Sequence, residues 1–271
     1  MNRLSQARLL TLAGELSERD RQIIETVMRL RLVSGTQLER LFFAATPNPA
    51  SRARLARRTL ARLVSLRLLD RLERRIGGVR AGAAGHVYYA TPGGQRLAAY
   101  WQGDGLRRAR SGYEPMASFV RHTLGIAESY VQLVEAERAG SVELLDFQSE
   151  PTAWQSYSGP GGARLMLKPD AFVRVGVSAE EEERAYLEID CGTEGRAALA
   201  RKCRAYLMAW QAGVGGAVFP RVVWITTTER RVALLTAICA SMPAEAWKLF
   251  VVTTPERALG VLMGAASEAS R

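Results

Sequence analysis

The chain has 271 residues, 48% of them hydrophobic, so one large domain or two of ordinary size can bury an apolar core. No apolar run approaches the roughly 20 residues that span a bilayer, and the N-terminus lacks an apolar stretch ending in a small-residue cleavage site. Three irregularly spaced cysteines exclude a disulfide framework and a Cys-x-x-Cys metal knuckle. We therefore expect a cytoplasmic protein with reduced thiols and no membrane partner.

The net charge of +10 is concentrated in the first part of the chain. Residues 1–110 contain 21 arginines and eight acidic side chains, whereas residues 111–271 contain 16 basic and 19 acidic side chains. Because neutralisation of phosphates drives sequence-independent binding to nucleic acids, the basic part suits a polyanion such as DNA. The two parts are therefore expected to have different functions.

Three helices are predicted in the basic part. Ser17-Glu-Arg-Asp20 has the form of a capping box, and apolar residues at helical spacing continue to about residue 32. A second, short helix is predicted to open at Thr36-Gln-Leu-Glu39. A third begins at Ser51, after the breaker TPNP, and its arginines recur at each helical turn, so it can face phosphates and base edges together. The candidate DNA-binding residues of this helix are Arg52, Arg54, Arg57, Arg58 and Arg62.

A basic hairpin is predicted after the third helix. One strand runs to about residue 75, a Gly-rich turn follows, and residues 86–90 form the return strand before a helix at 93–102. This order is that of a winged helix-turn-helix, in which the third helix enters the major groove and the wing touches the backbone. The alternative is that the arginines only solubilise a helical surface. The wing arginines are Arg74, Arg75 and Arg80.

The rest of the chain is predicted to form a mixed sheet flanked by helices. The winged helix domain would cover residues 1–102, a linker residues 103–114 and the second domain residues 115–271. The expected elements are a long helix at 115–139, strands at 142–148, 165–175 and 185–190, a helix at 196–212, a strand at 221–226, a helix at 229–240 and a strand at 248–253. The fold class is therefore α/β (α+β).

Three carboxylates fall on two of these strands. Side chains alternate along a strand, so Glu188 and Asp190 point to one face, and Asp170 lies on the preceding strand of an expected hairpin. Their mutual repulsion is costly unless a cation neutralises it, and hard oxygen ligands are what Mg²⁺ or Mn²⁺ needs to act on a phosphate. The alternative is that the acids pair with nearby arginines at strand ends. We expect a metal site formed by Asp170, Glu188 and Asp190.

Lys168-Pro169-Asp170 followed by Glu188-Ile-Asp190 resembles the PD-(D/E)xK core of restriction-endonuclease-like nucleases. Asp190 stands where that motif has a lysine. A lysine can instead arrive from the next helix as Lys202, with Tyr206 one turn further on the same face; the alternative is that Lys202 is a solvated surface residue. The resemblance implies that this lysine helps to position or activate the nucleophile.

A wider pattern resembles the replication-relaxation proteins of bacterial plasmids and integrative elements, and also the mobilisation relaxases of the restriction-endonuclease-like kind. The segments that carry the resemblance are SERDRQIIETVMRLRLVSGTQLERLFF, RHTLGIAESYVQLVEAE, LKPDAFVRV, YLEIDCGTEGRAALARKCRAYL, FPRVVWITTTE and LFVVTTPE. It implies sequence-specific binding of double-stranded origin DNA by the first domain and metal-dependent nicking or relaxation by the second. Asp170, Glu188 and Asp190 inherit the role of metal ligands.

The resemblance also directs attention to the long helix. His122 and Glu128 fall where such proteins often carry polar residues that face the site. Glu128 either completes the acidic cluster as a catalytic residue or is a helix-surface acid near Arg121. The alternative function is a replication or transfer regulator that no longer cuts DNA, in which the degenerate nuclease-like domain mediates homodimerisation or recruits other replication or transfer proteins.

Overall fold

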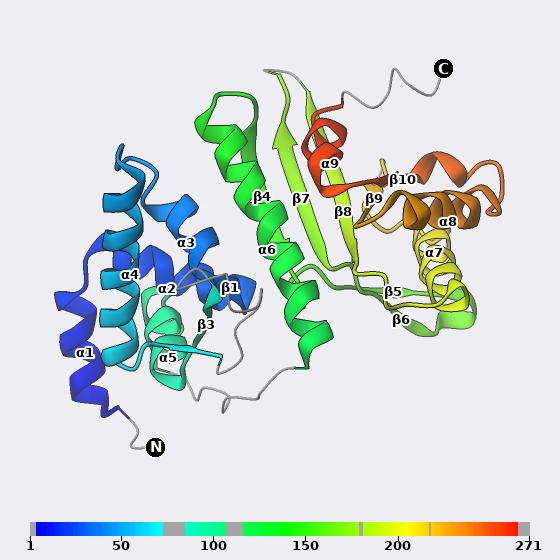
Figure 1. The fold of residues 1–271 in the computed structure, drawn as a ribbon. Coiled ribbons are helices and arrows are strands. Elements are labelled where there is room, and N and C mark those ends of the chain that lie inside the picture. Colours follow the sequence, from blue (N-terminus) through cyan, green and yellow to red (C-terminus); the bar gives the residue numbers. More distant parts are fainter. Residues whose placement is uncertain (1–3, 73–84, 107–115, 179–180, 217, 265–271) are drawn as a thin grey trace. The chain divides into compact units, whose positions relative to one another are not determined.

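The computed structural model describes residues 4–72, 85–106, 116–178, 181–216 and 218–264 (Figure 1). The chain forms two compact units, residues 1–131 and residues 132–271, and helix α6 (Ala117–Arg138) passes from the first into the second. Helices and strands occur in both units, so the predicted mixed fold class is confirmed. None of the helices in the described ranges has the length and apolar character needed to cross a bilayer.

The first unit combines helices with a small antiparallel sheet. Its sheet has the order β1-β3-β2, in which Val33 of β1 lies opposite Tyr88 of β3 and Leu69 of β2 opposite Ala90. Its elements are α1 (Gln6–Glu15), α2 (Glu18–Leu30), β1 (Val33–Ser34), α3 (Gly35–Phe42), α4 (Pro49–Ser65), β2 (Leu69–Arg71), β3 (Val87–Ala90), α5 (Pro92–Trp101) and the start of α6. The segment predicted to form the tip of the wing, residues 73–84, lies outside the described residues, as do residues 107–115 of the predicted linker.

Two capping boxes fix where helices of the first unit begin. Ser17 and Asp20 exchange hydrogen bonds at the start of α2, as the sequence predicts. At α3 the predicted start was wrong by two residues, because Ser34 is the N-cap: its hydroxyl accepts from the Gln37 N–H at 3.2 Å, and the Gln37 side chain accepts from the Ser34 N–H at 3.0 Å. Helix α1 was not predicted.

The second unit is built on a five-stranded mixed sheet of order β10-β9-β8-β7-β4. Strands β8, β9 and β10 are parallel to one another, whereas β7 pairs antiparallel with both β8 and β4. The elements are β4 (Glu143–Ser149), β5 (Gln155–Ser158), η2 (Pro160–Gly162), β6 (Arg164–Leu167), β7 (Ala171–Gly176), β8 (Glu182–Asp190), α7 (Arg196–Gln211), β9 (Arg221–Thr226), α8 (Glu229–Ala240), η3 (Trp247–Leu249), β10 (Phe250–Thr253) and α9 (Pro255–Leu262). The predicted mixed sheet with flanking helices is confirmed.

Helices α7 and α8 cover one face of this sheet. Tyr186 of β8 and Trp224 of β9 are fully buried under them. On the other face, Arg221 of β9 donates a hydrogen bond at 3.0 Å to the backbone oxygen of Val261 in α9. The buried helix residues are Leu199, Cys203 and Tyr206 from α7 and Leu235, Ile238 and Cys239 from α8.

The strand predicted at residues 165–175 is in fact two strands in different sheets. Strand β6 pairs with β5, a strand that was not predicted, and Gln155 lies opposite Leu167. Strand β7 instead joins the main sheet between β4 and β8. The break falls at Lys168-Pro169-Asp170, because proline has no N–H with which to continue a strand ladder. This correction matters for the site, since Asp170 stands at the break.

Candidate functional site

Asp170, which directly precedes β7, lies opposite Glu188 of the neighbouring antiparallel strand β8. The register pairs Ala171 with Leu187, which places the preceding Asp170 against Glu188. Both side chains are buried, with 5% and 1% of the residue surface exposed. The backbone N–H of Ile189 donates to Oδ2 of Asp170 at 2.7 Å, so the Asp170 carboxylate is turned toward β8. The hairpin expected from the sequence therefore brings these two acids together.

Helix α7 supplies two hydrogen-bond donors to Glu188. Nζ of Lys202 lies 3.0 Å from Oε2, and the Tyr206 hydroxyl donates to Oε1 at 2.5 Å. These donors are four residues apart, so they occupy the same face of the helix, as the sequence predicts. Lys202 also lies 3.7 Å from Glu194 and sits 5.7 Å from the ring centroid of Trp224. The lysine on α7 therefore contacts Glu188 of the acidic pair, while 35% of its side chain stays exposed.

The charges in this buried site shift its pKa values strongly. Burial and the negative charge of Asp170 raise the pKa of Glu188 to about 8, although Lys202 and Tyr206 act in the opposite direction. Burial lowers the pKa of Lys202, but Glu188 and Asp170 outweigh that effect and raise it, so the side chain stays an ammonium. Burial, together with Glu188, raises the pKa of Tyr206 well above its ordinary value, so its hydroxyl remains a donor. Two buried acids facing one lysine favour the approach of a further cation.

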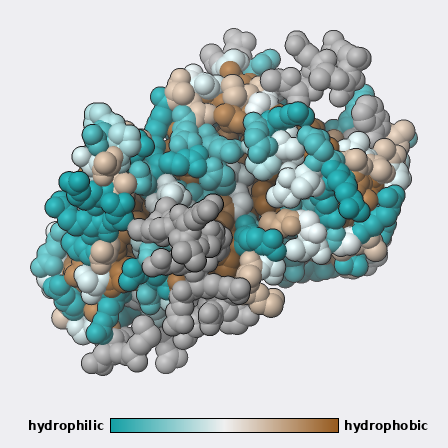
Figure 2. All heavy atoms as spheres, in the orientation of Figure 1, coloured by the Kyte–Doolittle hydropathy of each residue, from teal (hydrophilic) through white to brown (hydrophobic). Residues whose placement is uncertain are grey.

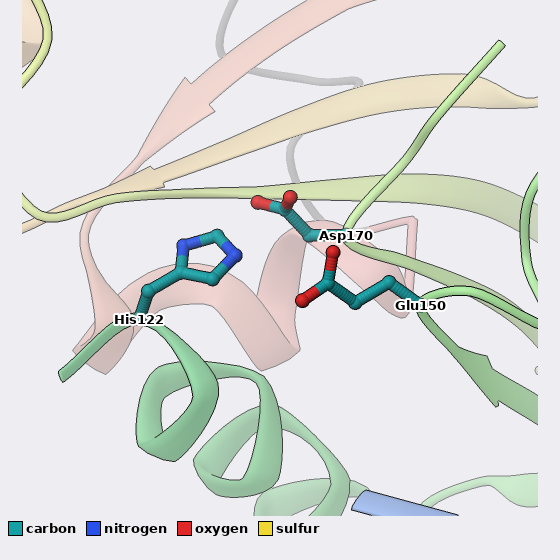
Figure 3. A group of neighbouring side chains, drawn as sticks. All are labelled: His122, Glu150 and Asp170. Atoms are coloured by element: carbon teal, nitrogen blue, oxygen red, sulfur yellow. The ribbon is translucent and has the colours of Figure 1, made fainter. Parts of the chain in front are cut away.

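Glu150 is a second acid beside Asp170 that sequence reasoning missed. It follows directly after β4, whose Ser149 pairs with Ala171, and its backbone N–H donates at 2.9 Å to the backbone oxygen of Asp170. Carboxylate oxygens of Glu150 and Asp170 lie within 4.8 Å of each other, and Figure 3 shows the two side chains next to each other. His122, also drawn there, lies on α6 in the first unit. The sequence shows that Glu150 follows a predicted strand. It does not show the strand register that brings Glu150 next to Asp170.

Asp190 is held in a different set of contacts. Nε and Nη2 of Arg231 donate to its two oxygens at 2.5 and 2.9 Å, the Thr226 hydroxyl donates at 2.9 Å and the Gly192 N–H at 3.1 Å. Arg231 donates as well to the backbone oxygen of Glu194 at 2.6 Å. Asp190 therefore ties the end of β8 to α8 and to the loop before α7.

This ion pair changes the interpretation of the third expected metal ligand. Burial alone would raise the pKa of Asp190, but the hydrogen bonds from Arg231, Thr226 and Gly192 lower it below its ordinary value. In the described part of the chain, Asp170, Glu188 and Asp190 do not form a set whose oxygens all lie within 4.8 Å of one another. Arg231 therefore occupies both oxygens of Asp190 in this structure, and the role of Asp190 as a metal ligand stays a prediction.

Glu128, the candidate catalytic acid on α6, is bound within the first unit. Nη1 of Arg40 lies 2.7 Å from Oε1, and the Gln37 side chain donates to Oε2 at 3.0 Å. Gln37 also donates to the backbone oxygen of Leu124 at 3.0 Å. These contacts hold α6 against α3. Neither interpretation made from the sequence, a member of the acidic cluster or an acid on the helix surface, included this structural role.

Three of the candidate DNA-binding arginines on α4 are exposed. Arg54, Arg57 and Arg58 form no ion pair with any residue that the structure describes, and α4 contains no acidic residue. Their spacing of three and four residues places them on one face of the helix. Figure 2 shows hydrophilic side chains over the part of the first unit that contains α4. This face of α4 presents positive charge to solvent.

The other candidate arginines differ. Nε of Arg52 lies 3.1 Å from Oε1 of Glu39, and Nη2 of Arg62 lies 2.5 Å from Oδ1 of Asp20, whose side chain is 2% exposed. These two arginines contribute to the packing of α4 against α3 and α2. The predicted wing arginines, Arg74, Arg75 and Arg80, lie outside the described residues.

The chain matches the model of a known protein family. A family model described as replication-relaxation matches residues 24–222, which run from α2 to β9. The matched region includes the exposed face of α4 and the buried acids with Lys202. No curated protein and no solved structure matches the chain.

Proposed function

The chain belongs to the replication-relaxation family, and from this premise we propose that it binds plasmid or mobile-element DNA and nicks or relaxes an origin by metal-dependent phosphodiester cleavage. Family membership indicates a role in plasmid replication or relaxation. The single observation that carries the proposal of cleavage is the buried pair Asp170 and Glu188, with Lys202 hydrogen-bonded to Glu188. Burial of two adjacent carboxylates makes their negative charge costly, and a cation that joins Lys202 at this site offsets part of that cost.

The donor set fits a hard divalent cation. Asp170, directly before β7, and Glu188 of the neighbouring strand β8 offer carboxylate oxygens, and Glu150, directly after β4, offers one within 4.8 Å of Asp170. Such oxygens suit Mg²⁺ or Mn²⁺, and Asp170 would hold the ion together with Glu150 on one side or Glu188 on the other. A bound ion would supply Lewis-acid polarisation of the phosphodiester and a more acidic water.

The remaining site residues have roles that follow from their contacts. The Lys202 ammonium balances the charge of Glu188 and can donate to a phosphoryl oxygen that approaches the acids. Tyr206 fixes the orientation of Glu188 from the buried side. In the restriction-endonuclease-like resemblance Asp190 replaces the motif lysine, and we propose that Lys202 supplies the missing positive charge from α7.

We propose that the first unit recognises double-stranded DNA as a winged helix. The order α2, β1, α3, α4, β2, β3 and the sheet order β1-β3-β2 support this proposal. In this arrangement α4 is the third helix and enters the major groove. Arg54, Arg57 and Arg58 on its exposed face would then contact phosphates and base edges.

The test is conversion of a supercoiled plasmid that carries the neighbouring origin into open circle, in Mg²⁺, Mn²⁺ or EDTA. Wild type is compared with Asp170→Asn, with Lys202→Met, and with Asp146→Asn as a matched control, since Asp146 is a β4 acid that accepts from Gln148. Metal-dependent nicking that is lost in Asp170→Asn and Lys202→Met but kept in the control supports the proposal. Nicking that survives in Asp170→Asn removes the site assignment.

One observation favours the second candidate function, a regulator built on a nuclease-like domain that no longer cuts. The position of the motif lysine is taken by Asp190, which is committed to Arg231. Tight, salt-sensitive DNA binding with no nicking in any metal would establish this alternative. A family role in replication is compatible with either outcome.

A further inference from the structure

A two-stranded ribbon, β5 and β6, separates the acids Glu150 and Asp170 in the sequence. Residues 151–169 connect the two acids and contain no acidic side chain, although residues 132–271 as a whole contain 17 acidic and 15 basic side chains. The cations of this connection are Arg164 and Lys168. The ribbon is therefore locally positive in a unit whose net charge is negative.

The two faces of the ribbon differ sharply. On the inner face, Leu167 is 2% exposed and belongs to the core under α7, while Gln155 accepts a hydrogen bond from the Tyr186 hydroxyl at 3.1 Å. On the outer face the cross-strand partners are Ser156 with Met166 and Ser158 with Arg164, and all four are exposed. The ribbon is thus anchored by one face and presents hydroxyl, thioether and guanidinium groups on the other.

Lys168 connects the ribbon to the acidic site. Its Nζ lies 4.8 Å from the ring centroid of Trp154, so it links the segment after Glu150 to the segment before Asp170. The Lys168 side chain is exposed and lies two residues from Asp170. An ammonium held there is placed to meet a polyanion that approaches the acids.

We propose that the outer face of the β5–β6 ribbon, together with Lys168, is a second contact surface for duplex DNA, which guides a strand to Asp170. The proposal rests on the proposed function and adds a DNA-binding element in the second unit. Four residues of strand span roughly 13 Å, and a two-stranded ribbon fits the major groove, which is about 12 Å wide. Arg164 and Lys168 bind phosphates, while Ser156 and Ser158 donate to phosphate or base-edge oxygens.

The experiment measures affinity of the full chain for a duplex origin fragment across a salt titration. A variant carrying Arg164→Ala and Lys168→Gln is compared with wild type and with Arg257→Ala, a matched control for an exposed arginine on α9. Each phosphate contact contributes about 0.9 to the magnitude of the slope of log binding constant against log salt concentration. The ribbon variant lacks two such contacts, so the magnitude of its slope is expected to be smaller by about 2. The control keeps the wild-type slope.

A second measurement detects the contact directly and does not depend on a loss of affinity in a variant. A photoreactive side chain in place of Ser156 is expected to crosslink to the duplex, whereas the same group in place of Arg257 is not. A wild-type slope in the ribbon variant, or no crosslink from position 156, overturns the proposal.

The possible results distinguish failure of the ribbon proposal from failure of the proposed function. If Arg58→Ala lowers the slope and the ribbon variant does not, only the ribbon proposal fails, since DNA recognition by α4 is then intact. If wild type binds no duplex DNA at any salt concentration, both proposals fail. If nicking is absent but the ribbon variant loses slope, the ribbon proposal stands for a protein that binds without cutting.

Discussion

The ion pair between Asp190 and Arg231 gives the sharpest prediction for stability. Replacing Arg231 with Met keeps most of the aliphatic stem but leaves the Asp190 carboxylate, whose side chain is 1% exposed, without its bidentate partner. The Arg231 side chain itself is only 14% exposed, so solvent screens the pair weakly. The remaining donors to Asp190 are Thr226 and the Gly192 N–H, which are neutral.

The expected loss of stability follows from the burial of this ion pair. Removing one partner of a buried ion pair costs about 3–5 kcal/mol, because the other charge remains desolvated and unpaired. Asp190→Asn removes the charge and keeps an acceptor, so it costs less, and the double variant is expected to show a coupling of about 1–3 kcal/mol between the two sites. A drop in melting temperature on the order of 10 °C corresponds to the larger loss.

The assay is urea unfolding followed by tryptophan fluorescence. Four of the five tryptophans lie in residues 132–271, so the signal reports mainly on the second unit, which contains the ion pair. The matched control is Arg174→Met, because Arg174 pairs with Glu182 in the same unit but the two side chains are 42% and 34% exposed. Solvent screening makes that exposed pair a minor contributor, so the control is expected to unfold close to wild type.

Two results would refute this reasoning. If Arg231→Met shifts the urea midpoint no more than Arg174→Met, the pair does not stabilise the unit. If the effects of Asp190→Asn and Arg231→Met simply add in the double variant, the two residues act independently and the ion pair contributes no coupling energy.

Three further predictions concern single contacts. Tyr206→Phe leaves Oε1 of buried Glu188 without its hydroxyl donor and is expected to cost about 1–3 kcal/mol, measured by the same urea titration. Arg62→Ala leaves Asp20 buried without its guanidinium and should lower the melting temperature of the first unit, by calorimetry, more than loss of an exposed α4 arginine does; an equal loss would contradict this. Because the pKa of Asp190 is lowered from 3.8, its contribution to stability is complete above that pH and is lost as the pH falls through the lower folded value, so acid should shift the urea midpoint of wild type more than that of Asp190→Asn.

Much of the secondary structure follows from local signals in the sequence. The strand at Arg221–Thr226 and the helix at Glu229–Ala240 have the predicted bounds, since each shows a clear apolar period with polar or breaking residues at its ends. The capping box at Ser17 likewise fixes α2, because both of its hydrogen bonds join residues only three apart. Short-range patterns also placed Lys202 and Tyr206 on one helix face.

The partners of the charged side chains depend on the tertiary structure. Asp170 lies next to Glu150 only because β4 pairs with β7 in a register that places Ser149 opposite Ala171. The β5–β6 ribbon separates the two acids along the chain, so their spacing in the sequence does not indicate that they are neighbours. Arg231 lies 41 residues after Asp190, so no local spacing predicts their contact.

The sequence by itself determined the mixed fold class, the basic first part and the alternation that buries Glu188 and Asp190 on one strand face. The alternation of side chains along a strand determines which face a residue occupies, but not which residue packs against it. Two residues on the same face, two positions apart, can contact different helices. Helix α7 reaches Glu188 through Lys202, while α8 reaches Asp190 through Arg231. Which acid faces the candidate site was therefore decided by helix packing, because a carboxylate's role depends on the charge packed against it.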